Sequence, residues 1–181
     1  LDFASADGSS NDMVTWLRTY DPQGQSQLTI NLWEDARIRT AYIAPAVDAQ
    51  GRLYVPENNK VVLFEADGSL AGEISLEKNH SVVSIGKDAD GSIYIGSVDR
   101  NGNCSLSEVY FEKRQLGEEL KNYPNSGQTV LIPAHEGDFL VNTQEQLFLY
   151  DPDTETSRSL FSWPECGIAG LSALCVAEDG E

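Results

Sequence analysis

Apolar and polar residues alternate with period two over short stretches of this chain, and turn-forming residues separate the stretches. The clearest example is residues 46–55, where two such stretches flank the segment Asp48-Ala-Gln-Gly51. Period-two alternation is typical of a β-strand with one buried face, and Asp-x-x-Gly is typical of a tight turn. Because helical periodicity is absent almost everywhere, the pattern predicts an all-β chain.

This strand–turn–strand unit recurs along the chain. It returns at residues 86–95, returns more loosely at 133–141, and begins again at 176–181. The turn glycines are about 40 to 46 residues apart, and they are Gly51, Gly91, Gly137 and Gly180. In step with them, an aromatic residue ends the third strand of each unit: Tyr20, Phe64, Phe111 and Tyr150. A repeat of that length built from short strands is typical of the blades of a β-propeller.

We expect residues 1–181 to form a single β-propeller domain or propeller segment, with about four blades of four antiparallel strands. The units are a partial blade at 1–33 with its last strand at 27–33, a linker at 34–40, full blades at about 41–77, 81–120 and 129–163, and the first strand of a further or ring-closing blade at 171–177. Two alternatives stay open. Either the strand at 171–177 closes a ring with the partial blade, in one chain or through a second copy, or the chain is a segment of a larger propeller.

The phrases Asp48-Ala-Gln-Gly-Arg-Leu-Tyr-Val55 and Asp88-Ala-Asp-Gly-Ser-Ile-Tyr-Ile95 resemble the repeats of bacterial propellers of the NHL and two-component-regulator types. The likeness covers most of the chain at the level of the repeat. It implies an extracytoplasmic sensor or interaction module, often with flanking domains in a longer chain. Enzymes with similar blades exist, including gluconolactonase-like hydrolases and virginiamycin-B-lyase-like proteins, but no motif ties this chain to either.

The charge balance excludes some classes of partner. The net charge is −17, from 29 acidic and 12 basic residues, and the longest basic run is Lys113-Arg114. Nucleic-acid binders need clustered Lys and Arg, so we expect no nucleic-acid partner. No apolar run approaches the roughly 20 residues of a membrane helix, so we expect no membrane insertion of this segment. The first residues lack the features of a signal peptide, and an extracytoplasmic location is expected from the resemblance alone.

Carboxylates are abundant but are not arranged as a recognisable metal site. Asp48, Asp88 and Asp90 lie in the repeated turns, where Asp accepts local backbone N–H bonds. The loop that begins at Asp99 has Cys104 and Tyr110 where an EF-hand needs Gly and Glu. We therefore expect no cofactor, with a surface calcium site as the alternative.

The connections between blades carry the candidate binding residues. In a propeller these linkers, together with the loops between second and third strands, share one face and converge on the central channel. The aromatic and cationic side chains there are Arg39, Tyr42, His80, Arg100, Tyr123 and Trp163. Such residues are enriched in binding hot spots, which predicts a binding surface; the alternative is that they cover the core between blades.

The predicted function is therefore a non-catalytic binding or scaffold module for a protein, a small molecule or a carbohydrate. The alternative is a propeller hydrolase or lyase acting on a small or carbohydrate-like substrate, with or without calcium. A catalytic propeller would need several acidic or His side chains converging at the channel, and the sequence shows such candidates scattered.

Overall fold

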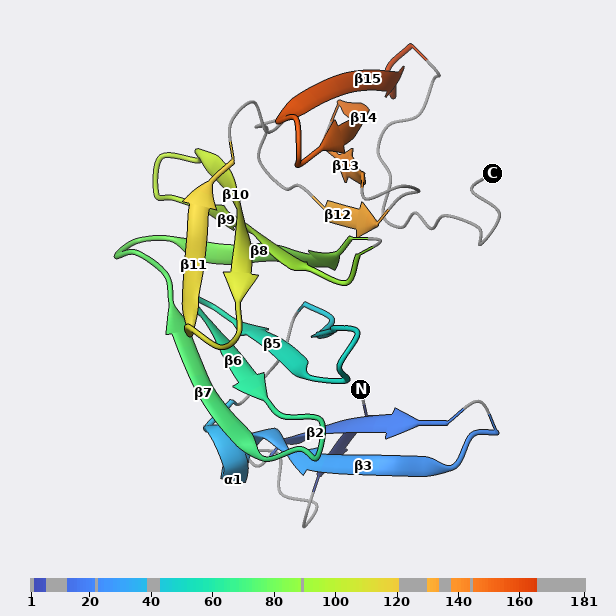
Figure 1. Ribbon diagram of the computed structural model, residues 1–181, viewed down its shortest axis with the longest axis vertical. Helices are drawn as coiled ribbons and strands as arrows, with labels where there is room; N and C mark the ends of the chain where they lie inside the picture. The colour runs from blue at the N-terminus through green and yellow to red at the C-terminus, as the bar shows by residue number, and fades with distance from the viewer. Residues whose placement is uncertain are drawn as a thin grey trace.

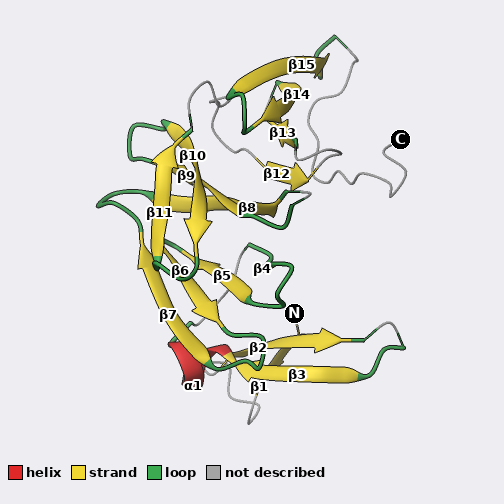
Figure 2. Ribbon diagram, viewed as in Figure 1, coloured by secondary structure: helices red, strands yellow, loops and turns green. Residues whose placement is uncertain are grey.

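The structure, a computed structural model, describes residues 2–5, 13–21, 23–38, 43–88, 90–120, 130–133, 138–143 and 145–165. Antiparallel β-sheets dominate it (Figures 1 and 2). Blade 1 contains β1 (Asp2–Ser5), β2 (Met13–Tyr20) and β3 (Ser26–Asn31), followed by helix α1 (Leu32–Ala36). Blade 2 contains β4 (Ala46–Val47), β5 (Leu53–Glu57), β6 (Lys60–Phe64) and β7 (Leu70–Ser75). Blade 3 contains β8 (Ser81–Lys87), β9 (Ile93–Val98), β10 (Cys104–Tyr110) and β11 (Gln115–Glu119). Blade 4 contains β12 (Val130–Pro133), β13 (Phe139–Asn142), β14 (Gln146–Asp151) and β15 (Thr156–Ser162).

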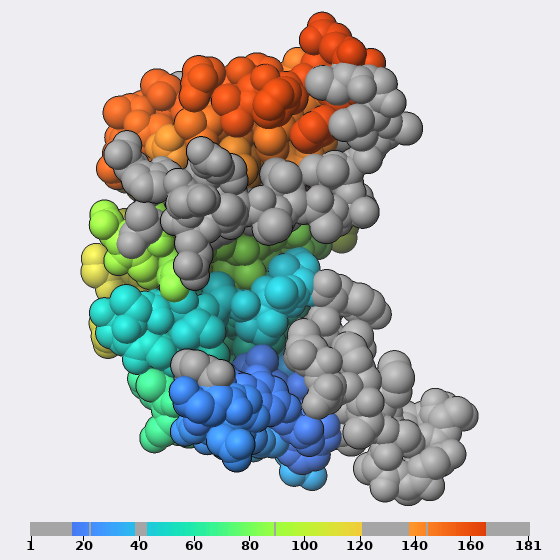
Figure 3. Space-filling view, turned by 90° about the vertical axis from the view of Figure 1, so that its right-hand side faces the viewer, coloured from blue at the N-terminus to red at the C-terminus, as the bar shows by residue number. Residues whose placement is uncertain are grey.

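The blades follow one another around an arc, with β7 and β11 on its convex side (Figure 1). The first strands of blades 2, 3 and 4 lie in sequence, since β8 contacts both β4 and β12. In the space-filling view the described parts of the blades form successive layers in chain order (Figure 3). This stacking of four-stranded sheets is the architecture of a β-propeller and confirms the predicted fold class.

Each pair of neighbouring blades encloses its own apolar cluster. In blade 2, Val62 and Phe64 pack toward blade 1, whereas Val61 and Leu63 pack toward blade 3. Tyr94 belongs to a third cluster, which joins blades 3 and 4. Because a central blade is covered on both faces, its middle strands read as continuous apolar runs rather than as strict alternation.

One predicted element is wrong at its end. The strand expected at 27–33 stops at Asn31, and α1 begins at Leu32. The Asn31 side chain caps this helix by accepting the backbone N–H groups of Trp33 and Glu34, each at 3.2 Å. The signal was an Asn followed by acidic residues, which favours a helix start over a continued strand. The strand predicted at 171–177 lies outside the described residues.

One four-residue turn joins five pairs of strands in the described chain. The N–H of its first residue donates to the carbonyl of the residue four positions later, and the glycine N–H donates to the first residue's carbonyl. The turn begins at Asp21, Asp48, Glu65, Asp88 and Asp99, and its glycines have φ between 79° and 89°. Glycine is required because other residues are strained in this left-handed region. The segment after Asp99 is therefore a tight turn of the common type.

Gly91→Ala is expected to destabilise the protein more than Gly24→Ala. Both glycines occupy this turn with positive φ, so left-handed strain of about 1–2 kcal/mol applies at either position. At Gly91 the added Cβ would also lie 3.0 Å from the Ala49 Cβ of blade 2, whereas nothing lies within 4 Å at Gly24. Denaturant unfolding measures the difference, and Ala49→Gly should recover part of the Gly91→Ala loss. Equal losses at both positions would contradict a role for the contact between blades.

Candidate functional site

Two cavities lie between blades 2 and 3, at opposite ends of the interface. The turn-face cavity has a volume of about 390 Å³ and is lined by the β4–β5 and β8–β9 turns and the β10–β11 hairpin. The linker-face cavity, also about 390 Å³, is lined by the connection from β7 to β8 and by β9, β10 and β11. The turn-face cavity contains charged side chains that form ion pairs with one another. The linker-face cavity contains polar side chains, some of which hydrogen-bond to no described residue.

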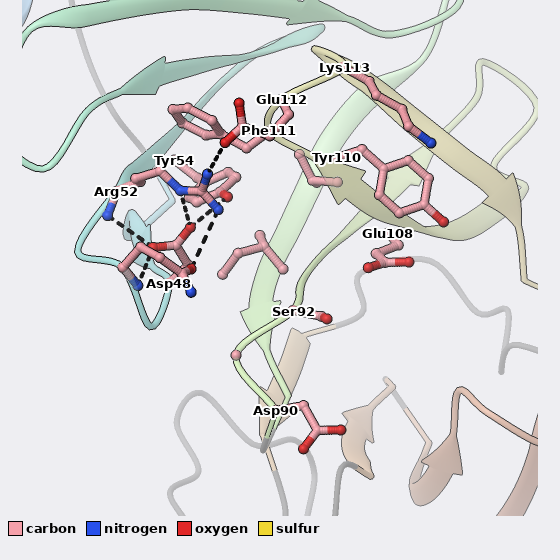
Figure 4. Close-up of a pocket in the computed structure, with 14 residues that line it drawn as sticks. Asp48, Arg52, Tyr54, Asp90, Ser92, Glu108, Tyr110, Phe111, Glu112 and Lys113 are labelled. Carbon is pink, nitrogen blue, oxygen red and sulfur yellow. Dashed lines mark hydrogen bonds and ion pairs between the residues drawn. The ribbon is translucent and has the colours of Figure 1, made fainter.

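Arg52 organises the turn-face cavity, as Figure 4 shows. Its Nε lies 2.6 Å from Asp48 Oδ2, and its Nη1 lies 2.7 Å from Glu112 Oε1 of blade 3. Its guanidinium lies 4.2 Å from the centre of the Phe111 ring. The Tyr54 hydroxyl donates to the same Asp48 oxygen at 2.9 Å, and the Tyr54 and Phe111 rings meet edge to face. The Arg52 cluster, made of these five residues, therefore joins the two blades.

The protonation behaviour of this cluster follows from its contacts. Burial alone would raise the pKa of Asp48, but hydrogen bonds and the charge of Arg52 outweigh it, so that the pKa falls below 3.8. Burial and the Asp48 carboxylate raise the pKa of Tyr54. The cluster is thus a carboxylate, a guanidinium and a neutral phenol at neutral pH, a satisfied arrangement that stabilises the fold.

The next blade repeats this arrangement without its cation. Asp88 and Tyr94 occupy the positions of Asp48 and Tyr54, but Ser92 stands in place of Arg52. Asp88 is 8% exposed and accepts the Ser92 N–H at 2.8 Å. Burial, and to a smaller extent the charge of Asp90, raise the pKa of Asp88 despite its backbone hydrogen bonds. Among the described residues no basic group contacts this carboxylate, so its ionised form is less stable than that of Asp48.

The linker-face cavity has a wall of serines on β9 and β10. Ser97 and Ser105 face each other across the two strands, and their hydroxyls lie 2.9 Å apart. Ser107 follows on the same face of β10 and is only 9% exposed, yet no described residue hydrogen-bonds to its hydroxyl. The Ser107 hydroxyl is open to the cavity, so a molecule there can hydrogen-bond to it; the buried hydroxyl without a partner among the described residues is that of Ser84.

His80 reaches the same cavity from the connection between blades 2 and 3. The backbone N–H of His80 donates to the Glu77 carbonyl at 3.1 Å, and Asn79 in between takes a left-handed conformation with φ of 78°. This turn places the half-buried His80 beside the cavity, and no described residue hydrogen-bonds to its imidazole. Of the predicted binding residues, His80 is therefore the one that lines a described cavity.

The other predicted binding residues are dispersed or outside the described residues. Arg100 is exposed in the β9–β10 turn, on the same face as His80. Trp163 is only 6% exposed, and its Nε1 donates to Asn142 Oδ1 at 3.1 Å. This ring therefore covers the end of blade 4. Arg39, Tyr42 and Tyr123 lie outside the described residues, so binding by these three stays a prediction.

Sequence reasoning missed the serine wall, although a signal was present. Ile93 and Ile95 face blade 2, and the same period places Ser97 there; Val109 likewise shares its face with Ser105 and Ser107. Three polar residues at positions that the period assigns to an apolar interface indicate a polar cavity.

The described ranges contain no group of three or more His, Cys, Asp or Glu side chains placed to hold a metal ion, and no helix in them is long and apolar enough to cross a membrane.

Arg52→Gln is expected to lower the free energy of unfolding at pH 7 by about 1–3 kcal/mol, since it leaves Asp48 buried without a cation. The pKa of Asp48 is lower in the folded than in the unfolded protein. The contribution of the ionised Asp48 to the free energy of unfolding is therefore complete above about pH 4 and is lost as the pH falls through the folded pKa. The difference from wild type should therefore shrink in acid. Denaturant unfolding at several pH values measures it, with exposed Arg100→Gln as the control; a difference independent of pH would contradict the assignment.

Ser92→Arg is expected to stabilise the protein by about 1 kcal/mol at pH 7, because it gives Asp88 the cation that Asp48 has. The pKa of Asp88 is higher in the folded protein than its ordinary value of 3.8, which applies to the unfolded protein. The wild-type protein therefore loses stability as the pH rises from 3.8 through the folded pKa. The gain should therefore vanish in acid, where Asp88 is protonated. Ser92→Gln, which adds length without charge, serves as the control; an equal gain from Gln would show that charge is not the cause.

Comparisons with known proteins support the fold. No protein-family model and no curated protein matches the chain. Among solved structures it is similar to virginiamycin B lyase from Staphylococcus aureus, with 15% identity and a TM-score of 0.65 over 91% of this chain and 54% of that chain. It is similar to a luciferin-regenerating enzyme, with 15% identity and a TM-score of 0.55 over 75% of this chain and 52% of that chain. It is also similar to the extracellular domain of a putative one-component system from B. thetaiotaomicron, with 17% identity and a TM-score of 0.56 over 91% of this chain and 22% of that chain. The chain thus spans about half the length of the lyase and has the β-propeller fold.

Proposed function

We propose that this chain is a ligand-binding propeller module, and that the linker-face cavity is its binding site for a small polar molecule. The observation that carries the proposal is that Ser107 lines the cavity and its hydroxyl hydrogen-bonds to no described residue. A bound molecule would hydrogen-bond to this hydroxyl and to the imidazole of His80, which lines the same cavity. The cavity volume of about 390 Å³ lies within the range of about 300–1,000 Å³ usual for small-ligand sites.

The rigidity of the surroundings supports a binding role. The serines belong to β-strands, and the connection that carries His80 is held to blade 2 by the Leu76 N–H, which donates to the Asn59 carbonyl at 2.8 Å. Blades 2 and 3 are also joined at their other end by the Arg52 cluster. A site on strands that are fixed at both ends keeps its polar groups in place before a ligand arrives, which lowers the entropy lost on binding.

The wider assignment follows the repeat and the structural neighbours. We assign the blades to the NHL or two-component-regulator type on the phrases that begin at Asp48 and Asp88. An extracytoplasmic location is supported by the neighbour that is an extracellular domain. Hydrolase or lyase activity, a protein partner and a calcium ion stay predictions of the sequence.

A screen by protein-observed NMR tests the binding site. The probes are mixtures of monosaccharides, amino acids and small carboxylic acids, and shifts are expected at the amides of Ser105, Ser107 and His80. Glu119→Trp should abolish them, because Glu119 is exposed at the cavity edge and pairs with Ser107, so the indole would lie on the cavity face at little cost to folding. Glu118→Trp is the matched control, since Glu118 is exposed on the same strand but does not line the cavity. Shifts confined to other surfaces, or unchanged by Glu119→Trp, would contradict the proposal.

A further inference from the structure

The linker-face cavity has two chemically different walls. One is the hydroxyl wall of Ser97, Ser105 and Ser107, which belongs to blade 3. The other contains the apolar side chains Ile74 and Leu76, which end blade 2, and Leu116 of β11. Ile74 and Leu76 are 3% and 7% exposed, so this wall is part of the core between the blades. A ligand that fills the cavity must therefore carry hydrogen-bonding groups on one side and a C–H surface on the other.

The hydroxyl wall favours ligands that are themselves rich in hydroxyls. Each serine hydroxyl can donate one hydrogen bond and accept others, so it matches a group that also does both. Ser97 and Ser105 already share one hydrogen bond, which leaves their remaining capacity and all that of Ser107 to an occupant. Apolar ligands would leave these groups unsatisfied, at the expense of binding affinity.

The charges around the cavity disfavour an anion. Glu77 and Glu119 line it, and within the described part of the chain neither forms an ion pair. Arg114 also lines it, but its side chain lies against Gly72 of β7, where it covers the backbone. Carboxylates accept hydrogen bonds well from neighbouring hydroxyls, whereas they repel another carboxylate or a phosphate. The whole chain adds a net charge of −17 to this repulsion.

We infer that the occupant of the linker-face cavity is an uncharged, polyhydroxylated ring of monosaccharide size. Such a ring has hydroxyls around its rim and C–H groups on its faces, which match the serine wall and the wall of Ile74, Leu76 and Leu116. The carboxylates of Glu77 and Glu119 complete the set of hydrogen-bonding partners around the rim. This inference rests on the proposed function and names the chemical class of its ligand.

Titrations with matched ring compounds test the class. The neutral probes are glucose, galactose and myo-inositol; glucuronate adds a negative charge and glucosamine a positive one. Binding is measured by amide shifts and calorimetry. The neutral rings are expected to bind in the cavity, and glucuronate at least about tenfold more weakly than glucose, because of the two carboxylates. Binding of glucuronate or glucosamine without binding of the neutral rings would overturn the inference while leaving the proposed site intact. Binding of no probe of any class, in this panel or in the wider screen, would overturn the proposed function as well.

A pair of serine variants separates recognition from folding. Ser107→Ala should weaken the binding of the neutral ring by about three- to tenfold through the loss of one hydrogen bond, without lowering stability. Ser84→Ala is the matched control: Ser84 is also a buried serine of blade 3 without a hydrogen-bond partner, but it pairs with Gly96 and so faces away from Ser97 and the cavity. Equal affinity in Ser107→Ala and wild type would contradict the role of the hydroxyl wall. If Ser107→Ala does not fold, the same comparison is made with Ser105→Ala.

Discussion

The structure depends on the packing of each sheet face against the next blade. A four-stranded sheet of this size cannot bury its own side chains, so every described blade shares its core with its neighbours. Blade 2 shows this most clearly, since adjacent residues Val61 and Val62 belong to clusters on opposite sides of the same sheet. The stability of one blade is therefore set largely by its contacts with the next, as in other repeat architectures.

Polar groups at these interfaces take two forms with different consequences. In the Arg52 cluster each buried polar atom has a partner, and the result is a cross-connection between Asp48 of blade 2 and Glu112 of blade 3. In the linker-face cavity the hydroxyl of Ser107 has none among the described residues. The first arrangement is therefore best understood as structure, and the second, with an open hydroxyl on its wall, as a place for a ligand.

Repetition of sequence does not guarantee repetition of chemistry. The turns that begin at Asp48 and Asp88 have the same backbone hydrogen bonds, yet Arg52 and Ser92 give the two buried carboxylates opposite pKa directions. The backbone of the turn depends on the glycine and on backbone hydrogen bonds, so the residue four positions after the first is free to vary. That freedom makes the two blade interfaces electrostatically different within one fold.

The sequence by itself determined the strands, the tight turns and their period, because alternation and Asp-x-x-Gly turns depend on residues that are close in the chain. It also placed His80 on the linker face, but it missed the short helix after Asn31, where capping outweighed the strand pattern, and the serine wall on β9 and β10. Tertiary structure alone decided which distant side chains meet: that Trp163 covers the end of blade 4, that Glu112 reaches Arg52, and that Ser97, Ser105 and Ser107 enclose a cavity with His80. The contacts of Trp163 and Glu112 join residues that lie 20 to 60 positions apart in the chain, and no local pattern encodes such contacts.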